Sequence, residues 1–229
     1  MTKKTTFLSG RSETVKLKKK KGRTISSKKW LQRQLNDPFV MEAKKKGYLS
    51  RAAFKLLELD ETFDLFKKKC RVIDLGAAPG GWTQVVLEKV DTSKPESQVI
   101  ALDILPMDAL EGAICLQMDF TKLESVEELY KLLKGPADVV LSDMAPPSTG
   151  HKSTDHLRII ALSEMALDFA LKVLAPGGTF ISKVWQGGSD ADLLKNLKKH
   201  FKTVKHVKPQ ASRKESAEIY VVALDFKKA

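Results

Sequence analysis

The chain has 229 residues, 42% of them hydrophobic, which suits one globular domain with a full core. No apolar run approaches the ~20 residues of a membrane-spanning helix, and the N-terminus lacks the apolar segment of a secretory signal. Two cysteines are too few for a disulfide framework and the four histidines show no metal-ligand spacing, so we expect a cytoplasmic protein with no membrane attachment and no metal.

Positive charge is concentrated at the start of the chain. The net charge is +12, and residues 1–50 account for all of it because they hold 15 Lys/Arg and three acidic residues. Residues 1–26 contain the run Lys18–Lys21 and almost no apolar side chains, so we expect a basic arm that is disordered in isolation. Such an arm favours RNA or DNA as a partner, because binding releases counterions from phosphates. A solvated tail that aids solubility is the alternative.

A helical segment is predicted after the arm, at residues 27–60. Pro38 following Asp37 is typical of a helix start, Gly47 is typical of a helix end, and Ser50 is a candidate cap for the next helix. We expect this segment to form the N-terminal part of a single domain that spans the rest of the chain.

From residue 70 onward, short apolar runs alternate with helical patterns, which is typical of an α/β sandwich. Strands are predicted near 71–75, 98–103, 113–117, 138–142, 178–184, 203–207 and 218–225. Helices are predicted near 81–90, 123–133, 154–174 and 189–199. No helix separates the last two strands, which should therefore form an antiparallel hairpin. A mostly parallel seven-stranded sheet with this hairpin and helices on both faces matches the Rossmann-like methyltransferases, with the core at 70–226 and the whole domain at 27–229.

Residues Val72–Trp82 have the pattern of a buried strand that breaks into a glycine-rich turn and opens a helix. Gly76 and Gly80 let a ligand approach the backbone, and the helix start presents free N–H groups to a carboxylate or phosphate. The dinucleotide fingerprint needs a glycine where this chain has Ala78, which disfavours NAD. Asp103 ends the next strand, where nucleotide-binding folds place an acid on ribose hydroxyls. S-adenosylmethionine, which lacks a pyrophosphate, fits these features better.

Four polar residues are candidates for a site at the carboxyl ends of the strands, where open α/β sheets bind ligands. Asp143 follows the fourth predicted strand, Lys183 ends the fifth, and Glu218 begins the last. Lys55 lies on the helix before the first strand. Lysine is seldom buried without a partner, so Lys183 in an apolar strand should have one. Each residue alone could be an ordinary solvated charge, but the combination favours a site.

These motifs resemble those of the FtsJ/RrmJ family of S-adenosylmethionine-dependent ribose 2'-O-methyltransferases acting on RNA. The resemblance runs from about Ser27 to Val222, through Ser50-Arg-Ala-Ala-Phe-Lys55, Asp74-Leu-Gly-Ala-Ala-Pro-Gly-Gly-Trp82 and Asp143-Met-Ala-Pro. It implies a catalytic tetrad of Lys55, Asp143, Lys183 and Glu218. The implied substrate is a uridine of large-subunit (23S) ribosomal RNA, in the large ribosomal subunit, with no obligate protein partner evident.

The resemblance also implies a set of cofactor contacts, which follow the first four predicted strands. They are Asp74, Gly76, Ala77, Pro79, Gly80, Gly81, Trp82, Asp103, Ile104, Asp119, Phe120 and Asp143. S-adenosylmethionine is the implied cofactor.

Ribose methylation is an in-line displacement in which the 2'-hydroxyl attacks a methyl group on a sulfonium, and a base must accept the hydroxyl proton. Lys183 is the candidate base, although a free lysine is protonated at neutral pH. Burial and the second cation, Lys55, favour the neutral amine, whereas Asp143 and Glu218 favour the ammonium. Lys183 therefore either takes the proton or stays charged and stabilises the developing oxyanion. We favour the first, with Asp143 orienting Lys183, and with Lys55 and Glu218 tuning the site or holding the ribose.

Base methylation is the nearest competing chemistry. Enzymes that methylate exocyclic amines typically end the fourth strand in Asn/Asp-Pro-Pro-aromatic, whereas Asp143-Met-Ala-Pro-Pro-Ser has no aromatic residue. Cytosine-C5 enzymes need a nucleophilic cysteine, and Cys70 and Cys115 lie beside or within predicted strands rather than on a rim loop. A ribose methyltransferase of another RNA, such as tRNA, and a non-catalytic RNA-binding ribosome assembly factor remain the alternatives.

Overall fold

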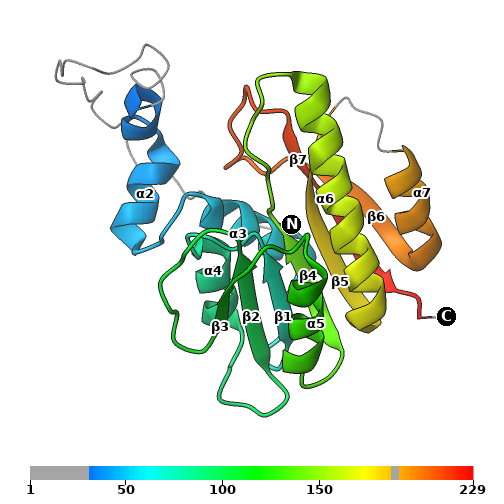
Figure 1. Cartoon of the computed structure of the whole chain (residues 1–229). Coiled ribbons are helices and arrows are strands. Elements are labelled where there is room, and N and C mark those ends of the chain that lie inside the picture. Colours follow the sequence, from blue (N-terminus) through cyan, green and yellow to red (C-terminus); the bar gives the residue numbers. More distant parts are fainter. Residues whose placement is uncertain (1–30, 187–190, 229) are drawn as a thin grey trace.

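The structure is a computed structural model that describes residues 31–186 and 191–228 (Figure 1). The basic arm predicted at 1–26 lies outside the described residues. Residues 31–35 are helical and lead into α2 (Pro38–Lys46). The Asp37 side chain caps α2 by accepting from the Phe39 amide, and Gly47 ends it with φ +80°. Both predicted boundaries of this helix are therefore confirmed.

The next helix, α3 (Ala52–Phe63), begins later than predicted and without a side-chain cap. The prediction that Ser50 caps it is wrong, since only the Ser50 carbonyl takes part, accepting from the Ala53 amide at 3.3 Å. The physical reason is that the Ser50 hydroxyl lies against Gly81, where a Cβ atom would collide with it. Ser50 thus packs the linker before α3 against the glycine-rich turn.

Seven strands form one sheet in the order β3-β2-β1-β4-β5-β7-β6. They are β1 (Arg71–Leu75), β2 (Gln98–Asp103), β3 (Ile114–Gln117), β4 (Ala137–Ser142), β5 (Leu174–Trp185), β6 (Phe201–Val207) and β7 (Glu218–Phe226). The first five are parallel, and β7 lies antiparallel between β5 and β6. The predicted terminal hairpin is confirmed, and its second strand is the one that joins the parallel part of the sheet.

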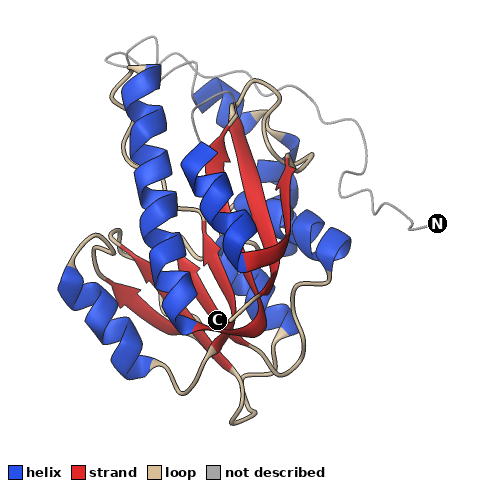
Figure 2. Cartoon of the chain, turned by 90° about the vertical axis from the view of Figure 1, so that its right-hand side faces the viewer, coloured by secondary structure: helices blue, strands red, loops and turns tan. Residues whose placement is uncertain are grey.

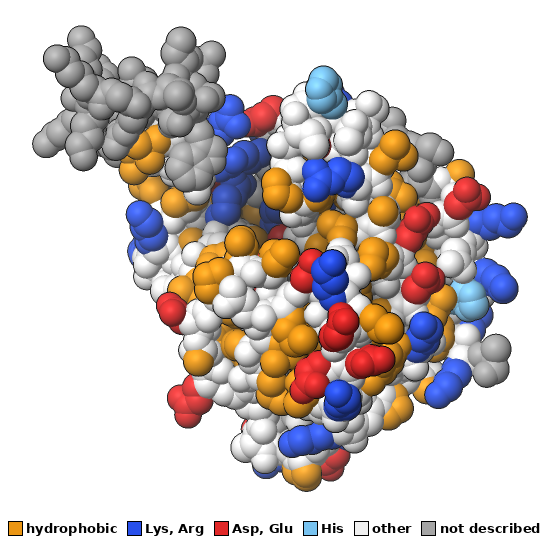
Figure 3. All heavy atoms as spheres, in the orientation of Figure 1, with side chains coloured by type: hydrophobic (Ala, Val, Ile, Leu, Met, Phe, Trp, Pro, Cys, Tyr) orange, Lys and Arg blue, Asp and Glu red, His pale blue; other side chains and the backbone are white. Residues whose placement is uncertain are grey.

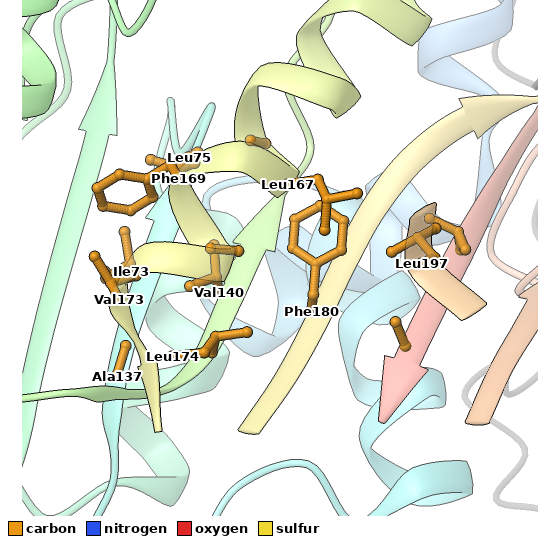
Figure 4. Packing of buried hydrophobic residues seen from close by; sticks show 14 of the residues in the cluster. Ile73, Leu75, Ala137, Val140, Leu167, Phe169, Val173, Leu174, Phe180 and Leu197 are labelled. Carbon is orange, nitrogen blue, oxygen red and sulfur yellow. The ribbon is translucent and has the colours of Figure 1, made fainter. Parts of the chain in front are cut away.

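Helices cover both faces of the sheet (Figure 2). The face covered by α3 and α4 (Gly81–Lys89) buries Leu56, Val85 and Tyr220. The opposite face is covered by α5 (Leu123–Leu132), α6 (Lys152–Val173) and α7 (Ala191–His200). There, Phe180 of β5 lies beside Leu167 of α6 (Figure 4). The alternation of buried residues along β5 and β7 therefore decides which side chains face α3, and these include the polar residues of the candidate site.

No helix in the described ranges is both long and apolar enough to cross a lipid bilayer.

Candidate active site

The four predicted tetrad residues come together at one edge of the sheet. Asp143 directly follows β4, and Lys183 lies near the end of β5. Glu218 begins β7, which runs antiparallel to β5 and therefore starts at the same edge. Lys55 reaches this edge from α3, which together with α4 covers one face of the sheet. The parallel topology thus brings together residues that are far apart in the chain.

The tetrad forms two ion pairs. Lys183 Nζ lies 3.0 Å from Asp143 Oδ1 and donates to the Asp143 backbone carbonyl at 2.6 Å. Lys55 Nζ lies 3.2 Å from Glu218 Oε2. Both lysines are buried, with 6% of Lys183 and 8% of Lys55 exposed. The prediction that Lys183 has a partner is confirmed, because an unpaired ammonium at this depth would lose its hydration without compensation.

Tyr220 links the two ion pairs, and the sequence reasoning missed it. Its hydroxyl donates to Asp143 Oδ1 at 2.7 Å and lies 3.0 Å from Lys55 Nζ, which donates to it. Tyr220 pairs with Lys183 across the β5–β7 ladder and follows Glu218 by two residues, so all three side chains face α3. Side chains two residues apart in a strand face the same side of the sheet, so the strand predicted at 218–225 could have indicated that Tyr220 lies beside Glu218.

The charges in this network fix the protonation of its central members. Burial acts to raise the pKa of Asp143, but the charges of Lys183 and Lys55 and the hydrogen bond from Tyr220 outweigh it and hold the pKa below its ordinary value. Burial, reinforced by the Asp143 charge, raises the pKa of the Tyr220 phenol well above its ordinary value. At neutral pH Asp143 is therefore a carboxylate and Tyr220 a hydrogen-bond donor to it.

The glycine-rich turn after β1 lies next to this network. The Asp143 amide donates to the Leu75 carbonyl at 3.0 Å, which joins the ends of β4 and β1. Gly76 has φ +80°, and a Cβ atom there would lie 2.7 Å from the Met144 backbone. Gly80 has φ +112° and caps α4 without any side-chain hydrogen bond, so the first amides of that helix remain available to an anionic group. The turn therefore forms a cradle of backbone N–H groups, whose chemistry suits a carboxylate.

Acidic residues stand at the ends of the two neighbouring strands. Asp103, the last residue of β2, is half-buried, and its two carboxylate oxygens accept from the amides of Ala78 and Leu105 at 2.9 and 2.8 Å. Asp103 thus ties the glycine-rich turn to the loop after β2, with lone pairs left for ribose hydroxyls. Asp119 follows β3, and hydrogen bonds from Thr121 hold the pKa of Asp119 below its ordinary value. Asp103 therefore borders the turn itself, and Asp119 lies in the loop after the next strand of the sheet.

Asp74 lies beneath the turn rather than on its surface. It is completely buried, one oxygen accepts from the Thr83 hydroxyl at 2.7 Å, and the other has no partner among the described residues. Burial raises the pKa of Asp74 to about 7, assisted by the charges of Asp143 and Asp103 and opposed by the bond from Thr83. The Asp74 side chain therefore supports the turn from within the core and does not line its surface.

Two predicted cofactor residues place their side chains in the hydrophobic cores. Trp82 is 2% exposed and donates its indole N–H to the Ala52 carbonyl at 2.8 Å. Its ring is tilted by 40° to that of Tyr220, with centroids 5.4 Å apart. Phe120 is 3% exposed and packs on the opposite face of the sheet. Both side chains therefore contribute mainly to core packing in this structure. Ile104, in contrast, is 61% exposed in the loop after β2.

Known proteins with related sequences and structures are plentiful. A family model described as FtsJ-like methyltransferase matches residues 48–226. The protein named ribosomal RNA large subunit methyltransferase E of Paramagnetospirillum magneticum is 61% identical over 219 residues, which cover 95% of this chain and 90% of that protein. The protein of the same name from Novosphingobium aromaticivorans is 55% identical over 212 residues, or 93% and 94% of the two chains. A crystal structure of a ribosomal RNA methyltransferase from Plasmodium falciparum matches with a TM-score of 0.69 and 33% identity, over 78% of this chain and 98% of that one.

The sheet order, the glycine cradle after β1 and the acidic residue at the end of β2 define the class: a Rossmann-like methyltransferase that uses S-adenosylmethionine. The family model and the sequence identities with its relatives then identify the family. The chain belongs to the FtsJ-like methyltransferase family.

Proposed function

We propose that this protein transfers a methyl group from S-adenosylmethionine to a ribose 2'-hydroxyl of large-subunit ribosomal RNA, the target being a uridine of the 23S molecule. The observation that carries the proposal is the buried network of Lys183, Asp143, Tyr220, Lys55 and Glu218 beside the cofactor cradle. The relatives named as large-subunit ribosomal RNA methyltransferases support the choice of RNA. A ribosomal substrate would place the enzyme in the cytoplasm.

The residues of the cradle fit the proposed cofactor. The first amides of α4 suit its carboxylate, and the carboxylate of Asp103 suits the two hydroxyls of its ribose. Asp119, after β3, and the exposed Ile104, after β2, are the residues proposed to contact the nucleoside. When bound, S-adenosylmethionine supplies an electrophilic methyl group on a sulfonium.

Lys183 is the proposed base. Asp143 takes up two of the three positions around Nζ through its side chain and its carbonyl, which leaves one position for a ribose hydroxyl. In this proposal Lys183 acts as the free amine: it would give its two N–H groups to Asp143, take the 2'-hydroxyl proton on its lone pair and become an ammonium stabilised by the Asp143 carboxylate. The cofactor, when bound, would supply the methyl group, with its methyl–sulfur bond breaking as the ribose oxygen takes the methyl and S-adenosylhomocysteine leaving. Tyr220 holds Asp143 in place from the other side, and Lys55 and Glu218 border the space for the ribose. Positioning of the 2'-hydroxyl against the methyl group supplies much of the remaining rate acceleration.

The test is methyl transfer from labelled S-adenosylmethionine to three substrates: intact large ribosomal subunits, free 23S ribosomal RNA and tRNA, followed by nucleoside analysis. The expected product is a 2'-O-methyluridine in the ribosomal RNA. Label on a base would contradict ribose chemistry, and label in tRNA alone would reassign the substrate. RNA binding without transfer to any of the three would indicate an assembly factor. Asp143→Ala, which removes the centre of the network, provides the inactive control.

A further inference from the structure

Three apolar side chains meet over the glycine-rich turn. A Cβ atom placed on Gly80 would lie 3.0 Å from methyl groups of Leu49 and Leu110 and 3.5 Å from that of Met107. Leu49 lies in the linker between α2 and α3, whereas Met107 and Leu110 lie in the loop after β2. Figure 3 shows hydrophobic side chains gathered below α2, on the part of the molecule where Figure 1 places that loop. Two segments that are far apart in the sequence thus form one apolar cover, consisting of Leu49, Met107 and Leu110.

The apolar cover is not part of the hydrophobic core. None of its three side chains is a member of the hydrophobic clusters in the described part of the chain. Leu49 is 44% exposed, and Met107 and Leu110 are half-buried. Gly80 beneath them is buried, although the neighbouring Pro79 is exposed. Partly exposed apolar side chains that converge on a binding turn are available to a ligand.

The helix that begins at this turn also holds the linker. Gln84, one turn after Gly80, accepts from the Leu49 amide at 2.7 Å and donates to the Gly47 carbonyl at 3.1 Å. The backbone amide of Gln84 donates to the Gly80 carbonyl at 2.9 Å. One residue of α4 is therefore bonded both to the turn and to the backbone of Leu49, and this fixes where Leu49 lies relative to the turn.

We propose that Leu49, together with Met107 and Leu110, covers the amino-acid end of bound S-adenosylmethionine, and that Gln84 is a positioning residue for Leu49. The first amides of α4 follow Gly80 and suit the carboxylate of that end. Apolar side chains over this contact exclude water, and a hydrogen bond to a charged group is stronger where water is excluded. The methylene groups of the same end offer apolar surface to the cover. This inference rests on the cofactor assignment within the proposed function and holds for any RNA substrate.

Two ligands separate the amino-acid end of the cofactor from its nucleoside end. S-adenosylhomocysteine carries both ends, whereas 5'-methylthioadenosine has the same nucleoside and a thioether but no amino-acid group. Calorimetry measures the affinity of each ligand for the wild type, Leu49→Ala and Leu157→Ala. Leu157 is 64% exposed on α6, which covers the other face of the sheet, so it is the matched control for truncation of a surface leucine.

Leu49→Ala should weaken S-adenosylhomocysteine binding by about five- to tenfold, because several buried methyl and methylene contacts are lost. Its affinity for 5'-methylthioadenosine should stay at the wild-type value, and Leu157→Ala should change neither affinity. Wild-type binding of S-adenosylhomocysteine by Leu49→Ala, or an equal loss for both ligands, would overturn the cover. A wild type that shows these affinities but methylates no RNA would overturn the proposed function and leave the cover standing.

Gln84→Ala tests the positioning role through a double-mutant cycle. The exchange removes both side-chain bonds to the linker, so we expect severalfold weaker binding of S-adenosylhomocysteine. If Gln84 acts through Leu49, the same exchange should add little in a Leu49→Ala background, because the cover is already lost. Circular dichroism checks that each variant is folded. Two losses that add fully, or no loss in Gln84→Ala alone, would overturn the positioning role.

Discussion

The Tyr220 hydroxyl donates to Asp143 Oδ1 at 2.7 Å while it accepts from Lys55 at 3.0 Å, so one phenol connects the two ion pairs of the tetrad. The tetrad and Tyr220 therefore form a continuous network of five side chains. Removing the hydroxyl separates the Lys183–Asp143 pair from the Lys55–Glu218 pair and leaves both pairs otherwise intact.

Tyr220→Phe should lower kcat roughly tenfold, because Asp143 loses a charge-assisted hydrogen bond of ~1.5–3 kcal/mol that orients it. Loss of that bond also raises the pKa of Asp143, so the acid side of the pH–rate profile should move to higher pH. Tyr48→Phe is the matched control, since Tyr48 donates to Glu88 outside the site. An unchanged kcat and pH profile in Tyr220→Phe would show that the link has no part in the reaction.

Lys183→Ala should retain cofactor affinity and lose at least ~10²-fold in turnover, the low end for removal of a general base. Lys183→Arg should not restore activity, because arginine does not release its proton near neutrality. Loss of Lys183 leaves Asp143 buried without its main partner, at a cost of about 3–5 kcal/mol, so folding must be checked by circular dichroism. Lys202→Ala, an exposed lysine of β6, is the control. Substantial turnover in the arginine variant would favour a purely electrostatic role.

Asp103→Ala should weaken S-adenosylmethionine binding by roughly ten- to a hundredfold, measured by calorimetry. The loss has two sources: the ribose contacts proposed for the carboxylate, and its hydrogen bonds to Ala78 and Leu105, which hold the turn and the next loop together. Asp108→Ala removes an exposed acid from the same loop and should bind normally. Wild-type affinity in a folded Asp103→Ala protein would remove Asp103 from the cofactor site.

The raised pKa of Asp74 predicts that the free energy of unfolding depends on pH. Burial raises its pKa to about 7 in the folded protein, whereas an unfolded aspartate titrates near 3.9. The folded state therefore binds the extra proton between these values, so the contribution of Asp74 to stability is fully present at low pH and is lost as pH rises toward about 7. Asp74→Asn, which keeps an acceptor for Thr83, should remove this contribution. Urea unfolding at pH 5 and pH 8 checks it: the wild type should lose more free energy of unfolding over this range than the variant, and equal losses would contradict the shift.

The strand and helix pattern of the sheet could be predicted from local sequence. Buried parallel strands such as β1 and β2 are continuous apolar runs, and the glycine-rich turn between β1 and α4 has its own local signature. The missing helix before β7 was enough to predict the terminal hairpin. Helix starts were less certain. The helix α2 begins at Pro38 as predicted, but Ser50 does not cap α3, because its hydroxyl packs against Gly81 of a distant element.

The sequence by itself determined the Rossmann-like class and the cofactor turn, because each rests on a local pattern, and its resemblance to a family implied the four tetrad residues. Only the tertiary structure decided how those residues interact. Tyr220 joins residues 77 and 165 positions away in the chain, and Asp37 meets an arginine 176 positions away, contacts that depend on strand order and on the packing of α3. The same packing placed Trp82 in the core. The spacing of apolar residues predicts which side of a strand or helix is buried, but it does not predict which other element packs against that side.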